Sequence, residues 1–348
     1  MSFKAAVLTK IKKPLQIIDN IKFVKLRREQ VLVRVLHSSI CRSQIMEIEG
    51  ERGKDKYIPH LLGHEGSGIV EKIGKGVTKI RPGNKIFLSW IKGKGLNSGG
   101  TKIKHNHGIL NAGPVTTFSN YSIVSENRCF LIPKKFPIKK SVIFGCAIPT
   151  GAGIIINEIK PKKKHSLCII GIGGVGLSIL MACKMLKLTN VLVIDVNKKK
   201  INIAKKLGYK KNIIIKNTKK TRSKIFNFTK GKYFDYVIES SGKIESIEFA
   251  FSITRKFGGK CFFVSHPNYN SNIRLNPFDL ISGKKIYGSW GGSSDPQKIA
   301  NLMAPFFLNN KRFLDLYFSK EYSLDNINHA IKYFKNKSAV KLIINNQI

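Results

Sequence analysis

The chain has 348 residues, of which 42% are hydrophobic, enough for two globular domains with buried cores. Its 62 Lys and Arg residues against 20 Asp and Glu residues give a formal net charge of +42. Because the lysines are scattered through every segment alongside abundant Ile and Asn, the charge indicates a compositional bias and argues against a nucleic-acid-binding face or tail. A functional surface for polyanions is the less favoured alternative.

The cysteines and the N-terminal residues indicate a compartment. All six cysteines stand singly, with no C-x-x-C pair, which argues against a disulfide framework and fits a reducing cytoplasm. Residues 1–10 lack the apolar core of a signal peptide. The longest uncharged run, 166–183, contains a glycine-rich turn, so we expect no membrane span there.

The chain up to about residue 146 is predicted to be rich in β-strands. Apolar or alternating runs bounded by Gly, Pro and charged residues are typical of the short strands of a barrel or sandwich. These runs lie at 5–8, 31–36, 68–73, 85–90 and 121–124. The stretch between Trp90 and Phe118 is polar and rich in Gly and Lys, so we expect a long surface loop there.

From about residue 150, strand-like and helix-like runs alternate, which predicts a parallel, doubly wound sheet in an α/β domain. After the strand that precedes a glycine turn, strands are expected at 191–194, 212–215, 236–240 and 261–265, and helices at 201–207 and 244–254. A further helix at 296–308 and an apolar run at 340–344 close the chain.

The glycine turn predicts a dinucleotide site. A strand, the pattern G-x-G-x-x-G, a helix and a second strand ending at Asp195 follow one another in 167–195. Such a turn presents backbone N–H groups at a helix N-terminus to the pyrophosphate, and the acid accepts hydrogen bonds from the adenosine ribose, which favours NAD over NADP. Lysines 198–200 equally fit a solvated helix start or contacts to a 2′-phosphate. The candidate residues of the turn are Gly171, Gly173, Gly174, Val175 and Gly176.

Three soft donors in the first segment predict a metal site. Two thiolates and one imidazole, from Cys41, His64 and Cys146, leave the fourth position of a catalytic zinc open for an alcohol or carbonyl oxygen. Taken singly, a cysteine is more often a small buried hydrophobe and a histidine a satisfied core group. The sequences around these residues decide between the two interpretations.

The run GHEGSGIVEKIGKGVTKIRPGNKI at 63–86 resembles the zinc-dependent medium-chain dehydrogenase/reductase family, the alcohol dehydrogenase superfamily. Cys41-Arg42-Ser43, Gly145-Cys146 with Thr150-Gly151, DYVIESSG at 235–242, GSWGG at 288–292 and Val340-Lys341 resemble further family motifs in the same order. The resemblance covers nearly the whole chain. It implies a GroES-like β-rich catalytic domain at 1–147 and 290–348, flanking a Rossmann NAD-binding domain at 148–289.

The resemblance also implies a role for each matching residue. It makes Cys41, His64 and Cys146 the ligands of one catalytic Zn²⁺ per chain, and Ser43 and Glu65 catalytic neighbours: Ser43 takes the substrate proton and Glu65 lies beside the metal. The implied cofactor contacts outside the glycine turn are Arg42, Thr150, Asp195, Lys200 and Lys341.

Departures from the family pattern are specific to this chain. Gln44 stands where an Asp often supports the ligand histidine, so we expect a neutral amide to orient that ring less well. Met46 stands where some members have a His that ends the proton relay, which leaves Glu47, a cofactor hydroxyl or water. No cysteine lies between Trp90 and Phe118, so we expect the four-cysteine structural zinc lobe to be missing.

We therefore expect a cytoplasmic, zinc-dependent, NAD-linked alcohol dehydrogenase that acts on a small alcohol, polyol or matching carbonyl compound. The resemblance implies a homodimer or homotetramer, and we expect no membrane or nucleic-acid partner. The alternatives are a zinc-free quinone or enone reductase of the same superfamily, or a basic nucleic-acid-binding protein with an inert oxidoreductase fold. The three filled ligand positions argue against the first alternative, and the cofactor turn beside them argues against the second.

Overall fold

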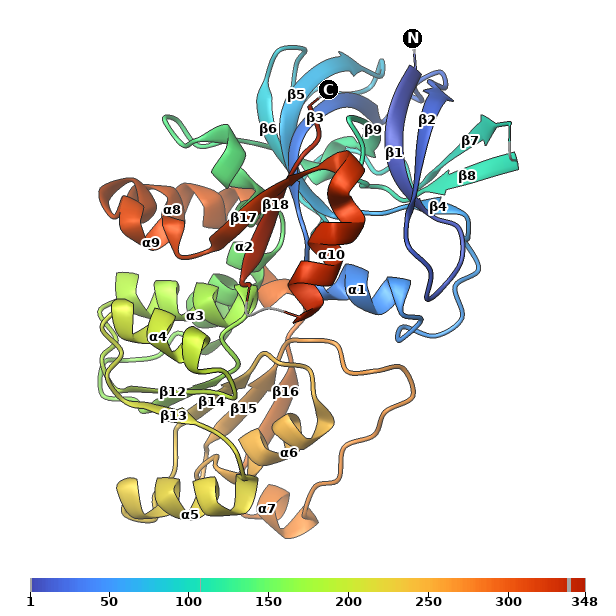
Figure 1. The fold of residues 1–348 in the computed structure, drawn as a ribbon. Coiled ribbons are helices and arrows are strands. Elements are labelled where there is room, and N and C mark those ends of the chain that lie inside the picture. The colour runs from blue at the N-terminus through green and yellow to red at the C-terminus, as the bar shows by residue number, and fades with distance from the viewer. Residues whose placement is uncertain (1, 107, 337–338, 348) are drawn as a thin grey trace. The chain divides into compact units, whose positions relative to one another are not determined.

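The computed structural model describes residues 2–106, 108–336 and 339–347 (Figure 1). The chain forms two compact units, Met1–Pro149 with Asp295–Ile348, and Thr150–Ser294. In the described part of the chain, no single helix is both long and apolar enough to cross a membrane; one bent pair, Ile138–Gly145 with Ala147–Ile159, passes that test by length and composition alone.

The first unit contains two sheets. The first has the strand order β2 (Gln16–Lys22), β1 (Ser2–Leu8), β4 (His60–Leu61), β8 (Gly108–Ala112) and β7 (Thr101–His105). The second has the order β10 (Cys129–Leu131), β6 (Lys85–Ser89), β5 (Glu65–Ile73), β3 (Gln30–Ser39), β18 (Lys341–Asn345) and β17 (Phe318–Ser323), with β9 (Tyr121–Ser125) also paired to β3. Strand β18, almost at the end of the chain, thus pairs directly with β3 near its beginning.

This unit also contains four helices in the described chain: α1 (Arg42–Ile48), α8 (Pro296–Asn309), α9 (Lys311–Asp315) and α10 (Ile327–Asn336). Helix α2 (Ala147–Gly153) begins in this unit and continues past its boundary at Pro149. Asp295 caps α8 by accepting from the backbone N–H groups of Gln297 and Lys298, and Pro296 at the first helical position lacks an N–H that would need a partner.

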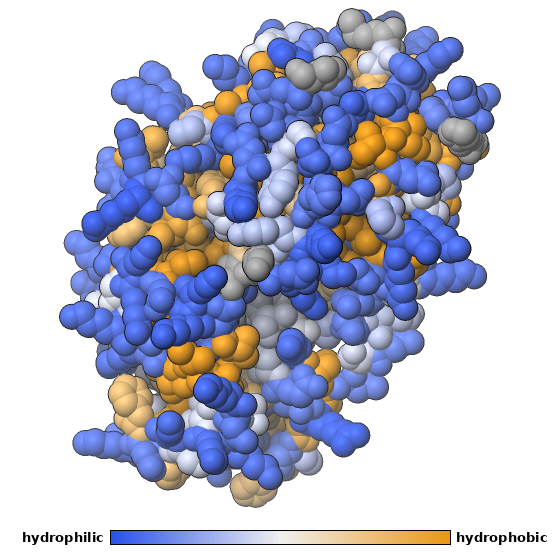
Figure 2. Space-filling model, viewed as in Figure 1, coloured by the Kyte–Doolittle hydropathy of each residue, from blue (hydrophilic) through white to orange (hydrophobic). Residues whose placement is uncertain are grey.

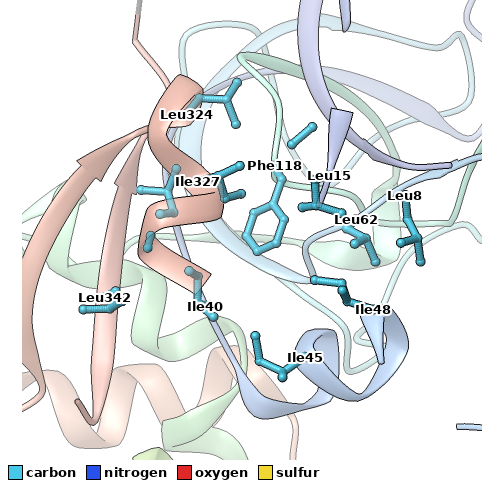
Figure 3. Close-up of a cluster of buried hydrophobic side chains, with 13 residues drawn as sticks. Leu8, Leu15, Ile40, Ile45, Ile48, Leu62, Phe118, Leu324, Ile327 and Leu342 are labelled. Carbon is cyan, nitrogen blue, oxygen red and sulfur yellow. The ribbon is translucent and has the colours of Figure 1, made fainter. Parts of the chain in front are cut away.

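One apolar cluster holds the segments that carry Cys41, His64 and Lys341 (Figure 3). Phe118 lies at its centre, between α10 and α1, and Ile40 immediately precedes Cys41 in the chain. Leu62 is two residues before His64, and Leu342 follows Lys341. Since all four apolar side chains are at most 3% exposed, the segments they belong to are fixed by ordinary hydrophobic packing.

The second unit is a parallel six-stranded sheet. Its strand order is β13 (Asn212–Ile214), β12 (Val191–Asp195), β11 (Leu167–Ile170), β14 (Tyr236–Glu239), β15 (Lys260–Phe263) and β16 (Lys285–Gly288). Helices α3 (Gly174–Met185) and α4 (Lys198–Lys206) lie on one face, and α5 (Thr218–Phe228), α6 (Ile244–Ser252) and α7 (Pro277–Ile281) lie on the other (Figure 1). This is the expected doubly wound α/β fold.

The fold class is confirmed, but one local expectation is wrong. The stretch between Trp90 and Phe118 is not a simple loop, because it contains the antiparallel hairpin β7–β8. Thr101 and Ile103 are buried while Lys102 and Lys104 between them are exposed, a period-2 alternation that the high Gly and Lys content obscured.

A buried carboxylate anchors the chain that leads into this hairpin. Glu126, 1% exposed, accepts hydrogen bonds from the backbone N–H groups of Thr78 (2.8 Å), Lys79 (2.7 Å) and Leu96 (2.7 Å). Burial by itself raises the pKa of the Glu126 carboxyl, but the three N–H donors outweigh it and lower the pKa. The face of the molecule in Figure 2 is mostly hydrophilic with smaller hydrophobic patches, as expected from the high lysine content.

Replacing Glu126 by Gln should lower the free energy of unfolding by about 1–3 kcal/mol, because one backbone donor then faces an NH₂ group. The pKa of Glu126 is lowered in the folded state, so its contribution is fully present above the ordinary carboxyl pKa and is lost as the pH falls through the lowered value. Urea titrations at neutral and acidic pH measure both effects. E29Q is the control, since Glu29 makes no side-chain hydrogen bond or ion pair with the described residues; an equal effect in both variants would contradict this role.

Candidate active site

Cys41 lies at the junction between strand β3 and helix α1. It is the N-cap residue of α1, and its backbone N–H donates to the side-chain oxygen of Gln44 at 2.6 Å. This reciprocal capping arrangement at the first turn of the helix fixes the direction in which the Cys41 side chain leaves the backbone.

His64 is placed by a turn that requires glycine. Gly63 has φ +93°, and a Cβ atom there would lie 2.7 Å from the backbone N of Phe118 and 2.8 Å from that of Thr117. Both of these N–H groups donate to the carbonyl oxygen of Leu62 at 3.0 Å. The chain can therefore turn into β5 at His64 only without a side chain at position 63.

Cys146 follows the 3-10 helix Ile138–Gly145. A Cβ atom on Gly145 would lie 2.9 Å from Cα of Glu65, so glycine allows this segment to approach the start of β5 closely. The hydroxyl of Ser89 donates to the carbonyl oxygen of Gly145 at 2.7 Å and holds it in place.

These three segments bring the predicted ligands together. One donor atom from each of Cys41, His64 and Cys146 lies within 4.8 Å of the others, and no other such group of three occurs among the described residues. A hydrogen bond with Cys146 and the positive charges nearby hold the pKa of the Cys41 thiol well below its usual range. The same hydrogen bond and burial raise the pKa of Cys146.

The donor set fits a zinc ion. His64 Nε2 is buried and has no nitrogen or oxygen partner among the described residues, whereas its Nδ1 lies 3.0 Å from the Gln44 amide nitrogen. Burial lowers the pKa of His64, but a hydrogen bond with Cys41 and the negative charges of Cys41 and Glu65 outweigh this and raise it. Two sulfurs and one imidazole nitrogen are ligands that zinc prefers.

A buried ion pair lies beside this group. Glu65 and Lys341 are 0% and 2% exposed in their side chains and form a salt bridge between β5 and β18. Burial raises the pKa of Glu65 although Lys341 opposes it, and the negative charges of Glu65 and the thiols raise the pKa of Lys341. The structure thus pairs Lys341 with Glu65, and the phosphate contact expected from the sequence stays a prediction.

The other two predicted residues of this segment differ in exposure. The Ser43 hydroxyl lies 3.5 Å from Nδ1 of His64, next to the candidate ligands. The Arg42 side chain is 61% exposed and 3.9 Å from Glu51, so its guanidinium is accessible to an anion.

A cavity of about 740 Å³ in the first unit opens beside His64. Sequence reasoning missed its lining, because these residues come from separate loops and carry no motif. The polar and aromatic side chains that line it are Glu47, Arg52, Lys54, Asp55, Tyr57, His60, His64, Thr101, Lys102, Asn111 and Thr116. Asp55 is paired with His60 at 2.8 Å and Glu47 with Arg52, which leaves Lys54 and Lys102 as lining cations without an ion pair in the described part of the chain.

In the second unit, the glycine turn lies where the sequence predicts it. Gly171 has φ +87°, and a Cβ on Gly176 would overlap the carbonyl oxygen of Gly171. A Cβ on Gly173 would meet nothing within 4 Å, so the backbone there faces open space. Gly173 caps α3, whose first residues are Gly174 and Val175.

Asp195 lies at the end of β12 and contacts this turn. It accepts hydrogen bonds from the backbone N–H groups of Ile172 (2.6 Å) and Asn197 (2.8 Å). Lys200 follows in the first turns of α4, half-buried. Thr150 is buried, and its hydroxyl has no partner among the described residues.

Comparison with known proteins identifies the same family that the sequence motifs resemble. Residues 27–134 match the family model of the alcohol dehydrogenase GroES-like domain, and 174–308 match that of the zinc-binding dehydrogenases. A benzyl alcohol dehydrogenase from Acinetobacter calcoaceticus is 27% identical, with a TM-score of 0.87 and 100% of each chain covered.

Two further solved structures share the fold. An alcohol dehydrogenase zinc-binding domain protein from Burkholderia ambifaria is 24% identical with a TM-score of 0.88, and both chains are covered to 100%. A 2R,3R-butanediol dehydrogenase from Bacillus subtilis is 21% identical with a TM-score of 0.78, covering 99% of this chain and 100% of the other. The chain belongs to the medium-chain dehydrogenase/reductase family, as an alcohol dehydrogenase-like oxidoreductase.

Replacing Lys341 by Met should lower the free energy of unfolding at neutral pH by about 3–5 kcal/mol, because the Glu65 carboxylate is then buried without its cation. K335M is the matched control. Lys335 pairs with Glu49 at 2.5 Å, but its side chain is 43% exposed, so its loss should cost less than about 1 kcal/mol. Urea unfolding measures both variants, and a K341M protein as stable as K335M would contradict the structural role of the pair.

Proposed function

We propose that the protein is a zinc-dependent, NAD-linked alcohol dehydrogenase, which transfers a hydride between an alcohol or polyol and NAD, with an aldehyde or ketone as the product. The observation that carries the proposal is the convergence of Cys41, His64 and Cys146 within 4.8 Å. Two thiolates and one imidazole leave a fourth position for the substrate oxygen. When bound, zinc supplies Lewis-acid polarisation of that oxygen and NAD supplies the hydride acceptor.

The protein's own groups then bind the substrate and move its proton. The cavity beside His64 has room for a small alcohol, and its apolar and cationic lining selects the part of the substrate away from the reacting carbon. Ser43, next to the ligands, takes the hydroxyl proton of the alcohol. Met46 is buried and cannot carry a proton, so the proton leaves Ser43 through water or Glu47, which lines the cavity. Glu65 and Lys341 keep the surroundings of the ligands nearly neutral in charge.

The proposed cofactor contacts are those that the family resemblance implies. The glycine turn and the N-terminus of α3 present backbone N–H groups to the pyrophosphate. The carboxylate of Asp195 still has acceptor capacity beyond its two backbone donors, and we assign it to the ribose hydroxyls of NAD. The remaining proposed contacts are Arg42 and Lys341 to phosphate, Lys200 to the ribose and Thr150 to the nicotinamide.

We also propose a homo-oligomer in the cytoplasm. Strand β16 is at the edge of the second unit's sheet in the described chain, and its Tyr287 is 39% exposed. Phe257 and Ile281, 79% and 81% exposed, are apolar side chains of the same unit that a second copy would cover. A reducing compartment keeps the ligand thiols of Cys41 and Cys146 free.

Replacing Cys146 by Ser should abolish alcohol-dependent reduction of NAD while leaving NAD binding intact, because the ligand set loses one sulfur and the cofactor turn is untouched. The loss should exceed the 10- to 100-fold that follows from removing an outer partner of a metal ligand. Nicotinamide absorbance with a panel of alcohols and polyols measures activity, and fluorescence titration measures binding. NADP should bind and react more weakly than NAD.

The control is C129S, because Cys129 is a buried cysteine of the same unit that lies outside the ligand group. It should retain activity. Full activity of C146S with every alcohol that the unmodified protein oxidises would contradict the proposed site.

A further inference from the structure

Gln44 is buried between two hydrogen-bonding partners. It is 1% exposed, its side-chain oxygen accepts from the backbone N–H of Cys41 at 2.6 Å, and its side-chain nitrogen lies 3.0 Å from Nδ1 of His64. The Ser43 hydroxyl is also near Nδ1, but at 3.5 Å it is at the limit of a hydrogen bond. The Gln44 amide is therefore the main partner of this ring nitrogen.

The backbone fixes which way the Gln44 amide faces. A backbone N–H only donates, so the atom 2.6 Å from the nitrogen of Cys41 must be the amide oxygen. The NH₂ group then faces His64, and it also only donates. Nδ1 of His64 must accept, which places the proton of the neutral ring on Nε2.

This proton is on the nitrogen that a metal needs. Nε2 is the ring nitrogen without a nitrogen or oxygen partner among the described residues, so it is the one open to a metal, and a metal ligand must offer a lone pair. Binding through Nε2 moves the proton to Nδ1, where it meets the NH₂ group of Gln44. Turning the amide over moves the clash to the N–H of Cys41, so one donor faces another in either orientation.

We propose that Gln44 is a positioning residue that holds His64 with its proton on Nε2 and thereby weakens zinc binding by Cys41, His64 and Cys146. The inference rests on the proposed zinc site. A carboxylate at position 44 would accept from both Cys41 N–H and His64 Nδ1–H, and so would have no such conflict. The site consequently binds its metal more weakly than the same three ligands would beside an accepting side chain.

The test compares the full-length unmodified protein with Q44E, which has the same shape but two accepting oxygens. Zinc dissociation constants are measured by competition with a chromophoric chelator. Nitrogen-15 NMR of the histidine rings in the metal-free proteins, with His64 assigned by its loss in H64N, shows which nitrogen carries the proton. We expect zinc to bind Q44E at least about 10-fold more tightly, and the ring proton to move from Nε2 to Nδ1.

Equal zinc affinity in the two proteins would overturn the inference. So would a His64 ring in the unmodified metal-free protein that carries its proton on Nδ1 or on both nitrogens, a result that needs no variant to fold. Tighter zinc binding by Q44E without a change of tautomer would also overturn it, because the added charge alone would then explain the affinity. If neither protein binds zinc, the proposed function fails together with the inference. If both bind zinc with equal affinity, only the inference about Gln44 fails.

Discussion

The buried ion pair between Glu65 and Lys341 is the interaction on which the first unit depends. The two residues are 276 positions apart, and their pairing links β18 to the start of β5 across the intervening strand β3, with almost no access to water. Removing two charges from water is costly, and it is compensated only when each has its partner in place. The pair therefore requires that the last strand of the chain be docked before the surroundings of Cys41, His64 and Cys146 are complete.

Ordinary packing does the remaining positioning. The apolar cluster around Phe118 includes Ile40, Leu62 and Leu342, which lie close in the chain to Cys41, His64 and Lys341. The segment of Cys146 is not part of this cluster. That segment is instead held by the close approach of Gly145 to Glu65. The ligands themselves are not part of this cluster, and Nε2 of His64 is buried without a nitrogen or oxygen partner among the described residues, as a metal ligand requires.

Much of this could be predicted from the sequence because it depends on local pattern. The alternation of strands and helices after residue 150 and the glycine turn ending in Asp195 are each short-range signals, and both appear in the structure. The ligand set was predictable only from the resemblance to a family, since Cys41, His64 and Cys146 have no mutual spacing that identifies a site. The hairpin β7–β8 was missed because its alternation is only five residues long on each side and is surrounded by glycines and lysines.

Other features depend on contacts that no sequence pattern encodes. The phosphate contact expected for Lys341 stays a prediction, whereas its ion pair with Glu65 is visible only in the structure. The orientation of the Gln44 amide likewise follows from the distances of its oxygen to Cys41 N and of its nitrogen to His64 Nδ1, and not from its position in a motif.

X-ray absorption at the zinc edge of the purified protein tests the central claim most directly. The account predicts a zinc ion with two sulfur neighbours at about 2.3 Å and at least one nitrogen neighbour at about 2.0–2.1 Å. A zinc shell of nitrogen and oxygen alone, or a purified active enzyme without zinc, would contradict it.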